Sequence, residues 1–189
     1  LCSGEVMALL GENGAGKSTL MKILSGVYTR DEGSLTIFGK EYGDLNPKLA
    51  QEVGVAIIHQ ELNMCRHLSV AENIFLGREK KNGIVLANSE MEKEAAAILE
   101  ELKINLDPRQ VVGELPVSKQ QMVEIAKAVS KNASILVFDE PSAALSDSET
   151  EFLFKMIRQL KEEGVSMVYI SHRMNEILEI CDRVTVIRD

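Results

Sequence analysis

The sequence lacks the features of a membrane-spanning, secreted or disulfide-bonded protein. No apolar run in its 189 residues approaches the roughly 20 residues that cross a bilayer. The first residues carry no basic segment, so the pattern predicts no signal peptide. The three cysteines are scattered, odd in number and without a C-x-x-C spacing, which argues against a disulfide framework or a zinc site. A reducing cytosol fits this usage.

Positive charge is also scarce. The formal net charge is −8, whereas a broad nucleic-acid surface needs clustered Lys and Arg, so we expect no nucleic-acid partner. One cationic loop can still bind a nucleotide locally. With 45% hydrophobic and 26% charged residues, the composition suits one globular α/β domain. Because the chain begins at Leu1, close to its first motif, we expect it to be a piece of a longer protein.

That first motif is the glycine-rich loop GENGAGKST at residues 11–19, which follows a mostly apolar strand predicted at Glu5 to Leu10. Its glycines let backbone N–H groups turn toward anionic oxygens without side chains in the way. Lys17 adds a cation, Ser18 offers a hydroxyl to a magnesium ion, and Thr19 begins a helix whose N-terminus favours negative charge. The order strand, loop, helix predicts a nucleotide-phosphate site rather than a chance glycine turn.

Alternating apolar patterns along the chain predict an α/β fold, and the phosphate loop at residues 11–19 makes it similar to the P-loop NTPase (RecA-like) class. We expect strands at 5–10, 35–38, 54–58, 134–138, 165–170 and 184–187, and helices beginning at 19 and 69 and over 88–103, 119–131, 149–161 and 174–180. This order indicates a parallel sheet with helices on both faces and a small antiparallel edge at 35–38. Residues 1–68 and 132–189 would form the ATP-binding core, and 69–131 an inserted helical subdomain.

Polar residues follow several of these strands. Because ligands bind at the carboxyl ends of parallel strands, Gln60, Asp139, Glu140 and His172 should converge on the loop. Asp139 can hold the water shell of a magnesium ion, and Glu140 can accept the proton of the attacking water. Gln60 can reach the metal and that water, and His172 can either hydrogen-bond the γ-phosphate or orient the water. Together they predict hydrolysis of a phosphoanhydride.

The ordered motifs resemble the ATP-binding subunits of ABC transporters. GENGAGKST is similar to the Walker A motif of that family, Gln60 to its Q-loop, ILVFDEP to its Walker B with Glu140 as catalytic glutamate, residues 143–146 to its D-loop, and His172 to its switch histidine. The segments ELNMCRHLSVAENIFLGRE, QQMVEIAKAV and VYISHRMNEI further resemble monosaccharide importers of the ribose and galactose type. In that subfamily two such domains lie in tandem on one polypeptide.

The resemblance implies ATP and Mg²⁺ as cofactors, and it carries over to individual residues. The nucleotide-binding set would be Gly11, Asn13, Gly14, Ala15, Gly16, Lys17, Ser18, Thr19 and Gln60. Ser18, Gln60 and Asp139 would bind the metal. Lys17, Glu140 and His172 would be catalytic.

The implied activity is ATP hydrolysis that powers sugar import. Two ATPase domains would close head to tail, with the second domain on the same full-length chain, and drive membrane permease subunits. A sugar-binding protein would take part indirectly. The domain would sit peripherally at the cytoplasmic face of the cell membrane, held by the permease.

Two departures from the family pattern are visible. Where the family has LSGGQ, this chain has Leu115-Pro116-Val117-Ser118-Lys119, which lacks the serine and both glycines at their places and removes a backbone donor at Pro116. We expect the composite site that uses this segment to be impaired. In addition, none of the ten residues before Gly11 is aromatic, although the family stacks an aromatic on adenine there. We therefore expect weak ATP binding and slow turnover by this chain alone.

Other functions fit parts of the pattern. An ABC-type ATPase acting on nucleic acid or the ribosome would share the motifs, but the acidic balance opposes it. A catalytically weak regulatory ABC domain is favoured by the broken signature and opposed by the intact Lys17, Asp139, Glu140 and His172. A P-loop kinase would need an acceptor-substrate site, for which the sequence shows no candidate.

Overall fold

A parallel sheet forms the centre of the molecule. The computed structural model describes residues 1–59, 62–82 and 85–188. Its main sheet has five parallel strands in the order β4 (Val55–Ile58), β7 (Ile135–Asp139), β8 (Ser166–Ile170), β1 (Val6–Leu10) and β9 (Arg183–Val186). Each expected strand of this sheet is present within two residues of its predicted bounds. The parallel sheet expected from the alternation is therefore confirmed.

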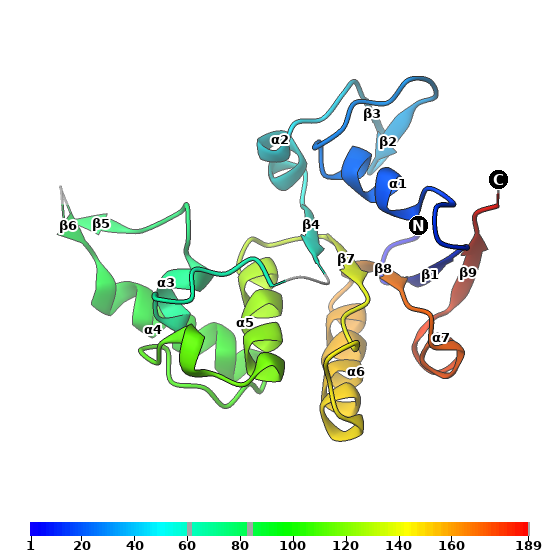
Figure 1. The fold of residues 1–189 in the computed structure, drawn as a ribbon. Helices are drawn as coiled ribbons and strands as arrows, with labels where there is room; N and C mark the ends of the chain where they lie inside the picture. Colours follow the sequence, from blue (N-terminus) through cyan, green and yellow to red (C-terminus); the bar gives the residue numbers. More distant parts are fainter. Residues whose placement is uncertain (60–61, 83–84, 189) are drawn as a thin grey trace.

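Helices cover both faces of this sheet, as the sequence predicts. Figure 1 shows α1 (Lys17–Leu24) on one side of the strands, and α6 (Asp147–Glu162) and α7 (Met174–Ile180) on the other. Since neighbouring strand residues point to opposite faces, Val137 packs with Met21 of α1, whereas Phe138 packs in the cluster that contains α6. Side chains that alternate along each strand thus pack against helices on opposite faces of the sheet.

A separate antiparallel pair lies beside α1. Strands β2 (Leu35–Ile37) and β3 (Lys40–Tyr42) pair in antiparallel register and form a sheet of their own. Only the first of these two strands is predicted from the sequence. Helix α2 (Pro47–Glu52) follows and was not predicted, although Asn46 caps it by accepting from the backbone N–H of Leu49 at 2.9 Å. Asn followed by Pro at the first helical position is the signal that identifies such a helix.

The helices between β4 and β7 gather at one end of the molecule, away from β1 and β9 (Figure 1). They are α3 (Val70–Ile74), α4 (Asn88–Glu101) and α5 (Val117–Val129), with the short strands β5 (Lys81–Asn82) and β6 (Val85–Leu86) and the 3₁₀ turn Val112–Glu114. Helix α3 begins with a capping box, in which Ser69 Oγ accepts from the Glu72 N–H and Glu72 Oε2 accepts from the Ser69 N–H, so the helix predicted to begin at residue 69 is confirmed. Helix α3 packs against both α4 and α5.

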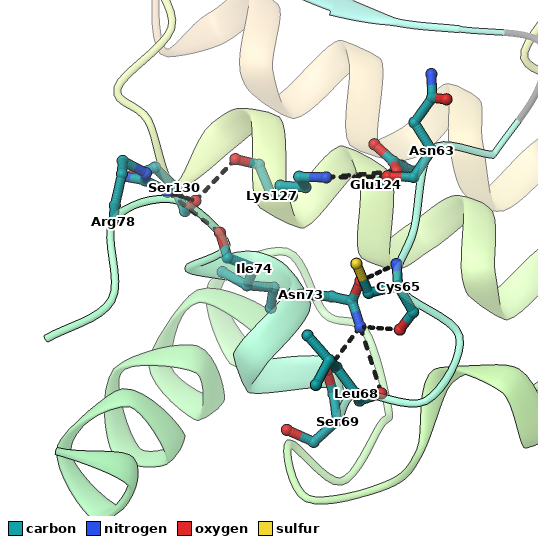
Figure 2. A network of polar contacts seen from close by, with 10 residues as sticks. All are labelled: Asn63, Cys65, Leu68, Ser69, Asn73, Ile74, Arg78, Glu124, Lys127 and Ser130. Carbon is teal, nitrogen blue, oxygen red and sulfur yellow. Dashed lines mark hydrogen bonds and ion pairs between the residues drawn. The ribbon is translucent and has the colours of Figure 1, made fainter. Parts of the chain in front are cut away.

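Asn73 fixes the loop that enters this helical group. Its side chain is fully buried, and its amide nitrogen donates to three backbone carbonyls, those of Cys65, Leu68 and Ser69, at 3.0, 3.3 and 3.0 Å (Figure 2). Its Oδ1 accepts from the Cys65 N–H at 2.9 Å. The loop therefore obtains its hydrogen bonds from a side chain rather than from a strand partner.

Three helices begin earlier than predicted. Helix α1 begins at Lys17 rather than Thr19, because Gly16 takes the N-cap position in a left-handed conformation. Helix α5 begins at Val117 rather than Lys119, directly after Pro116. Helix α6 begins at Asp147 rather than at residue 149, since Ser146 and Glu149 form a capping box. Within the described ranges, no helix combines the length and apolar content that a bilayer-crossing segment requires.

Candidate functional site

The carboxyl ends of β1, β7 and β8 surround a pocket of about 300 Å³. These strands are neighbours in the sheet and run in the same direction, so the segments that follow them meet at one edge. The pocket is lined by Asn13, Gly14, Gly16, Lys17, Ser18, Thr19, Asp139, Glu140, Ile170 and His172. It brings together residues that are more than 150 positions apart in the sequence. Gln60 lies outside the described residues.

The glycines of the loop serve two separate purposes. A Cβ at Gly11 would lie 2.7 Å from the carbonyl oxygen of Ile187, so close packing against the end of β9 requires glycine there. Gly14 and Gly16 have φ angles of +94° and +95°, which only glycine adopts at little cost, and a Cβ at either would meet open space. Because both residues line the pocket, their bare backbone forms a cradle there.

Lys17 brings positive charge to this cradle. It is the first residue of α1, and its ammonium turns back to donate to the carbonyl oxygens of Gly11 at 2.8 Å and Glu12 at 2.9 Å. The N-terminus of α1 has no side-chain cap, so the free N–H groups of its first turn also face the loop. A lysine and an uncapped helix N-terminus together favour an anion in the pocket.

Two carboxylates stand opposite the loop. Asp139 ends β7, and burial raises its pKa, to which the neighbouring Glu140 carboxylate adds, while His59, Lys17 and His172 act in the opposite direction. A cation beside Asp139 would therefore compensate a carboxylate that the protein itself stabilises incompletely. Burial next to a loop cation is the setting expected of a carboxylate that helps to hold a magnesium ion.

Glu140 and His172 are in direct contact, with 2.6 Å between Glu140 Oε1 and His172 Nε2. Glu140 adopts a left-handed conformation, with φ at +50°, which turns the chain out of β7 and toward β8. Its backbone N–H donates to the Ile170 carbonyl at 2.9 Å and thereby fixes this turn. Left-handed residues other than glycine are costly and concentrate at functional sites. The contact joins the two residues that the sequence predicts to act on water and phosphate.

The residues of the pocket fit a nucleoside triphosphate with a divalent cation. The glycine cradle offers backbone N–H groups at a place where a side chain would fill the space, and Lys17 offers a cation. The Ser18 hydroxyl and the Asp139 carboxylate line the same pocket, and oxygen ligands of this kind suit Mg²⁺. Sequence reasoning missed Ile170, since the last residue of an apolar strand carries no signal of a polar site.

The altered signature segment lies elsewhere. Residues 115–119 stand at the N-terminus of α5 in the helical group and are not among the described residues that line the pocket. Pro116 is the N-cap, Val117 is exposed, and Ser118 is buried. The segment therefore lies outside the pocket that Lys17 lines.

Comparison with known proteins identifies the family. A family profile described as "ABC transporter" matches residues 1–143. The chain is 55% identical over 188 residues to "Ribose import ATP-binding protein RbsA" of Geobacillus kaustophilus (strain HTA426), covering 98% of this chain and 38% of that protein. It is 53% identical over 191 residues to "Putative ribose/galactose/methyl galactoside import ATP-binding protein 2" of Burkholderia cenocepacia (strain HI2424), covering 100% and 37%. The chain thus spans less than two fifths of the length of these relatives.

Solved structures agree with this result. The crystal structure of the ADP conformation of an ATP-binding cassette of an ABC transporter matches with a TM-score of 0.84 and 28% identity, covering 98% of this chain and 77% of that one. A nucleotide-free ATP-binding cassette matches with a TM-score of 0.86 and 27% identity over 98% and 77%. The expected P-loop NTPase fold class is confirmed. From its family profile, its relatives and its fold, the chain belongs to the ABC transporter family.

Proposed function

We propose that this domain binds and hydrolyses ATP and that the hydrolysis powers sugar import through a membrane permease. The observation that carries the proposal is the pocket in which the loop of residues 11–19, Asp139, Glu140 and His172 converge. The names of the relatives, which are ribose and galactose import ATP-binding proteins, support the sugar. Hydrolysis of a phosphoanhydride needs charge neutralisation, a positioned water and a proton acceptor, and each has a residue here.

The chemistry follows from the positions of these residues. The loop backbone and Lys17 would hold the phosphates, and Ser18, Asp139 and, as the sequence suggests, Gln60 would be the oxygen ligands of the metal. When bound, Mg²⁺ neutralises charge on the outer phosphates. Glu140 accepts the proton of the attacking water, and His172, at 2.6 Å, orients that carboxylate beside the γ-phosphate. As the family resemblance implies, a second domain would close the site over the nucleotide.

The wider assembly is part of the proposal. Residues 1–68 and 132–189 form the ATP-binding core, and residues 69–131 form the helical subdomain that carries the signature segment. The length of the relatives supports a second ATP-binding domain in tandem on the same polypeptide. The permease subunits hold the domain at the cytoplasmic face of the membrane, and the sugar-binding protein acts through the permease.

The proposal is tested with two variants that separate binding from hydrolysis. Lys17→Ala removes the loop cation and is expected to weaken ATP binding. Glu140→Gln keeps the shape of the site and is expected to bind ATP while losing about 10²–10⁴-fold in hydrolysis, the usual contribution of a general base. The control is Glu32→Gln, on an exposed turn outside the pocket. Unchanged hydrolysis in Glu140→Gln, measured by phosphate release from the permease complex, would reject ATPase activity at this site.

One observation favours a second role, in which this domain contributes poorly to the composite site of its partner. At the N-terminus of α5, Pro116 has no N–H to donate, and Val117 adds bulk at the surface. The Ser118 hydroxyl, on the same chain, and the two hydrogen bonds that Glu149 accepts from Ser146 lower the pKa of Glu149 to about 2. The segment is therefore poorly equipped to hold a phosphate.

This second role is tested by replacing Pro116, Val117 and Ser118 with Ser, Gly and Gly in the tandem protein. If the segment impairs one of two composite sites, the replacement raises the rate of ATP hydrolysis. An unchanged rate would contradict the impairment. Glu140→Gln in the same background shows how much of the rate comes from the site built on Lys17.

A further inference from the structure

One buried carboxylate collects hydrogen bonds from both segments that carry the proposed reacting residues. Glu176, on α7, is only 2% exposed. Its Oε2 accepts from three hydroxyls, those of Ser142 at 2.8 Å, Tyr169 at 2.9 Å and Ser171 at 2.9 Å. Its Oε1 accepts from an Arg173 guanidinium nitrogen at 3.1 Å. Both carboxylate oxygens are therefore bonded within the protein.

Such a group is expensive to place in an interior. Burying a carboxylate costs several kcal/mol unless charge-assisted hydrogen bonds replace its water shell. A packing role at this position would be served by an apolar side chain, since Ile177 and Ile180 of the same helix are buried without any such network. Packing alone therefore does not explain a buried carboxylate at this position. The positions of its hydrogen-bond donors suggest another role.

The partners adjoin the reacting residues. Ser142 lies two positions after Glu140, and Ser171 directly precedes His172. The hydroxyl of Ser171 also accepts from the Arg173 N–H at 3.0 Å, which fixes its orientation while it donates to Glu176. One carboxylate oxygen thus fixes the chain immediately after the proposed base and the chain immediately before the histidine.

The two reacting residues depend on such support. The left-handed backbone of Glu140 is held by hydrogen bonds from its N–H to Ile170 and to its carbonyl from the Ala143 N–H at 3.2 Å. His172 is about half exposed, so few contacts of its own hold it at 2.6 Å from Glu140. The spacing between these side chains is therefore set mainly by their backbones.

We propose that Glu176 is a positioning residue, which holds the Ser142 and Ser171 segments together so that Glu140 and His172 stay in register during ATP hydrolysis. The inference rests on the proposed ATPase function and deepens it. It assigns Glu176 no contact with the nucleotide. Loss of the Ser142 or Ser171 hydroxyl should misplace Glu140 or His172. Loss of the third hydroxyl bound to Glu176 should misplace neither.

The third hydroxyl provides a matched control. Tyr169 donates to the same oxygen and is fully buried, but it lies within β8, where pairing with the strands on both sides already fixes the backbone. Tyr169→Phe removes one hydroxyl from Glu176 without releasing either segment. A purely structural network would respond to Tyr169→Phe as it does to Ser171→Ala, whereas a positioning network would not.

The experiment compares Ser142→Ala, Ser171→Ala, Tyr169→Phe and Glu176→Gln in the permease complex. For each serine variant and for Glu176→Gln we expect the kcat of ATP hydrolysis to fall by about tenfold to a hundredfold, as misplacement of reacting groups does, with KM for ATP within about twofold of wild type. The double variant Ser142→Ala, Ser171→Ala should lose less than the product of the single losses, because both act through Glu176. Tyr169→Phe should keep kcat within about twofold.

A second measurement does not depend on turnover. The imidazole NMR signals of His172 should shift in Ser171→Ala and Glu176→Gln and stay in place in Tyr169→Phe, with exposed His67 as an internal reference. Equal losses of kcat in Tyr169→Phe and Ser171→Ala, or an unmoved His172 signal, would overturn the inference while leaving ATPase activity standing. Absence of hydrolysis by the wild-type complex would overturn the proposed function and the inference with it. If Glu176→Gln fails to fold, the serine variants decide.

Discussion

The phosphate cradle can be tested by comparing Gly16→Ala, inside the pocket, with Gly33→Ala, a control variant at a glycine of similar conformation outside the pocket. Gly16→Ala places a Cβ on a residue with φ at +95° and with nothing within 4 Å. Gly33→Ala does the same at φ +86°, also in open space, on a turn outside the pocket. The left-handed conformation costs a residue with a Cβ about 1–2 kcal/mol. Both variants should therefore lose a similar amount of stability.

Nucleotide binding should separate the two variants. At Gly16 the new methyl group stands in the pocket, where phosphate oxygens would have to approach the backbone to hydrogen-bond distance. We expect ATP to bind Gly16→Ala at least about tenfold more weakly than Gly33→Ala, which is about 1.4 kcal/mol. Tighter binding would require the loop to rearrange around the methyl group, and the close contact of Gly11 with β9 restrains such a movement.

Two measurements on Gly16→Ala and Gly33→Ala test this prediction. Urea unfolding of each variant gives the loss of stability, and calorimetric titration with ATP and Mg²⁺ gives the dissociation constant relative to wild type. The predicted pattern is equal destabilisation with unequal binding. If Gly16→Ala bound ATP as tightly as Gly33→Ala, residues 11–19 would not form the phosphate cradle. If only Gly16→Ala were destabilised, the comparison of strain at the two glycines would be wrong.

Three further predictions concern packing and burial in the fold around the site. Gly26→Ala should be destabilised by about 2–4 kcal/mol in urea unfolding, more than Gly33→Ala, because its Cβ would lie 2.4 Å from a backbone atom of the residue that caps α2 and its φ is +73°. Asn73→Ala should lose about 2–4 kcal/mol by the same assay, because it leaves buried backbone groups of the entry loop unpaired; a loss below about 1 kcal/mol would contradict that account. Burial raises the pKa of Cys181 to about 12, so at pH 8 its labelling by iodoacetamide should be at least tenfold slower than that of exposed Cys2, as measured by mass spectrometry of the labelled peptides. Equal rates would show that the Cys181 thiol is accessible and ordinary.

Much of the fold follows from local patterns. Along the chain, the strands of the main sheet alternate with helices that have one apolar face. Each of these strands lies within two residues of its predicted place. Helix α3 was located from Ser69 and Glu72, which form its capping box and are only three residues apart, and from apolar residues on the turns that follow. The elements that were not predicted have short local signals: β5 and β6 pair over two residues each, and only Asn46 and Pro47 indicate the start of α2.

By itself, the sequence determined the phosphate loop, the residue types at the strand ends and the family resemblance. These properties depend on residues that are close in the chain, where backbone geometry fixes their spacing. The tertiary structure decided that Glu140 touches His172, since that contact depends on β7 and β8 being neighbours and on the left-handed turn after β7. It also decided that Glu176 accepts a hydrogen bond from the Ser142 hydroxyl, 34 positions away in the sequence, because no local pattern sets the distance between residues on different elements.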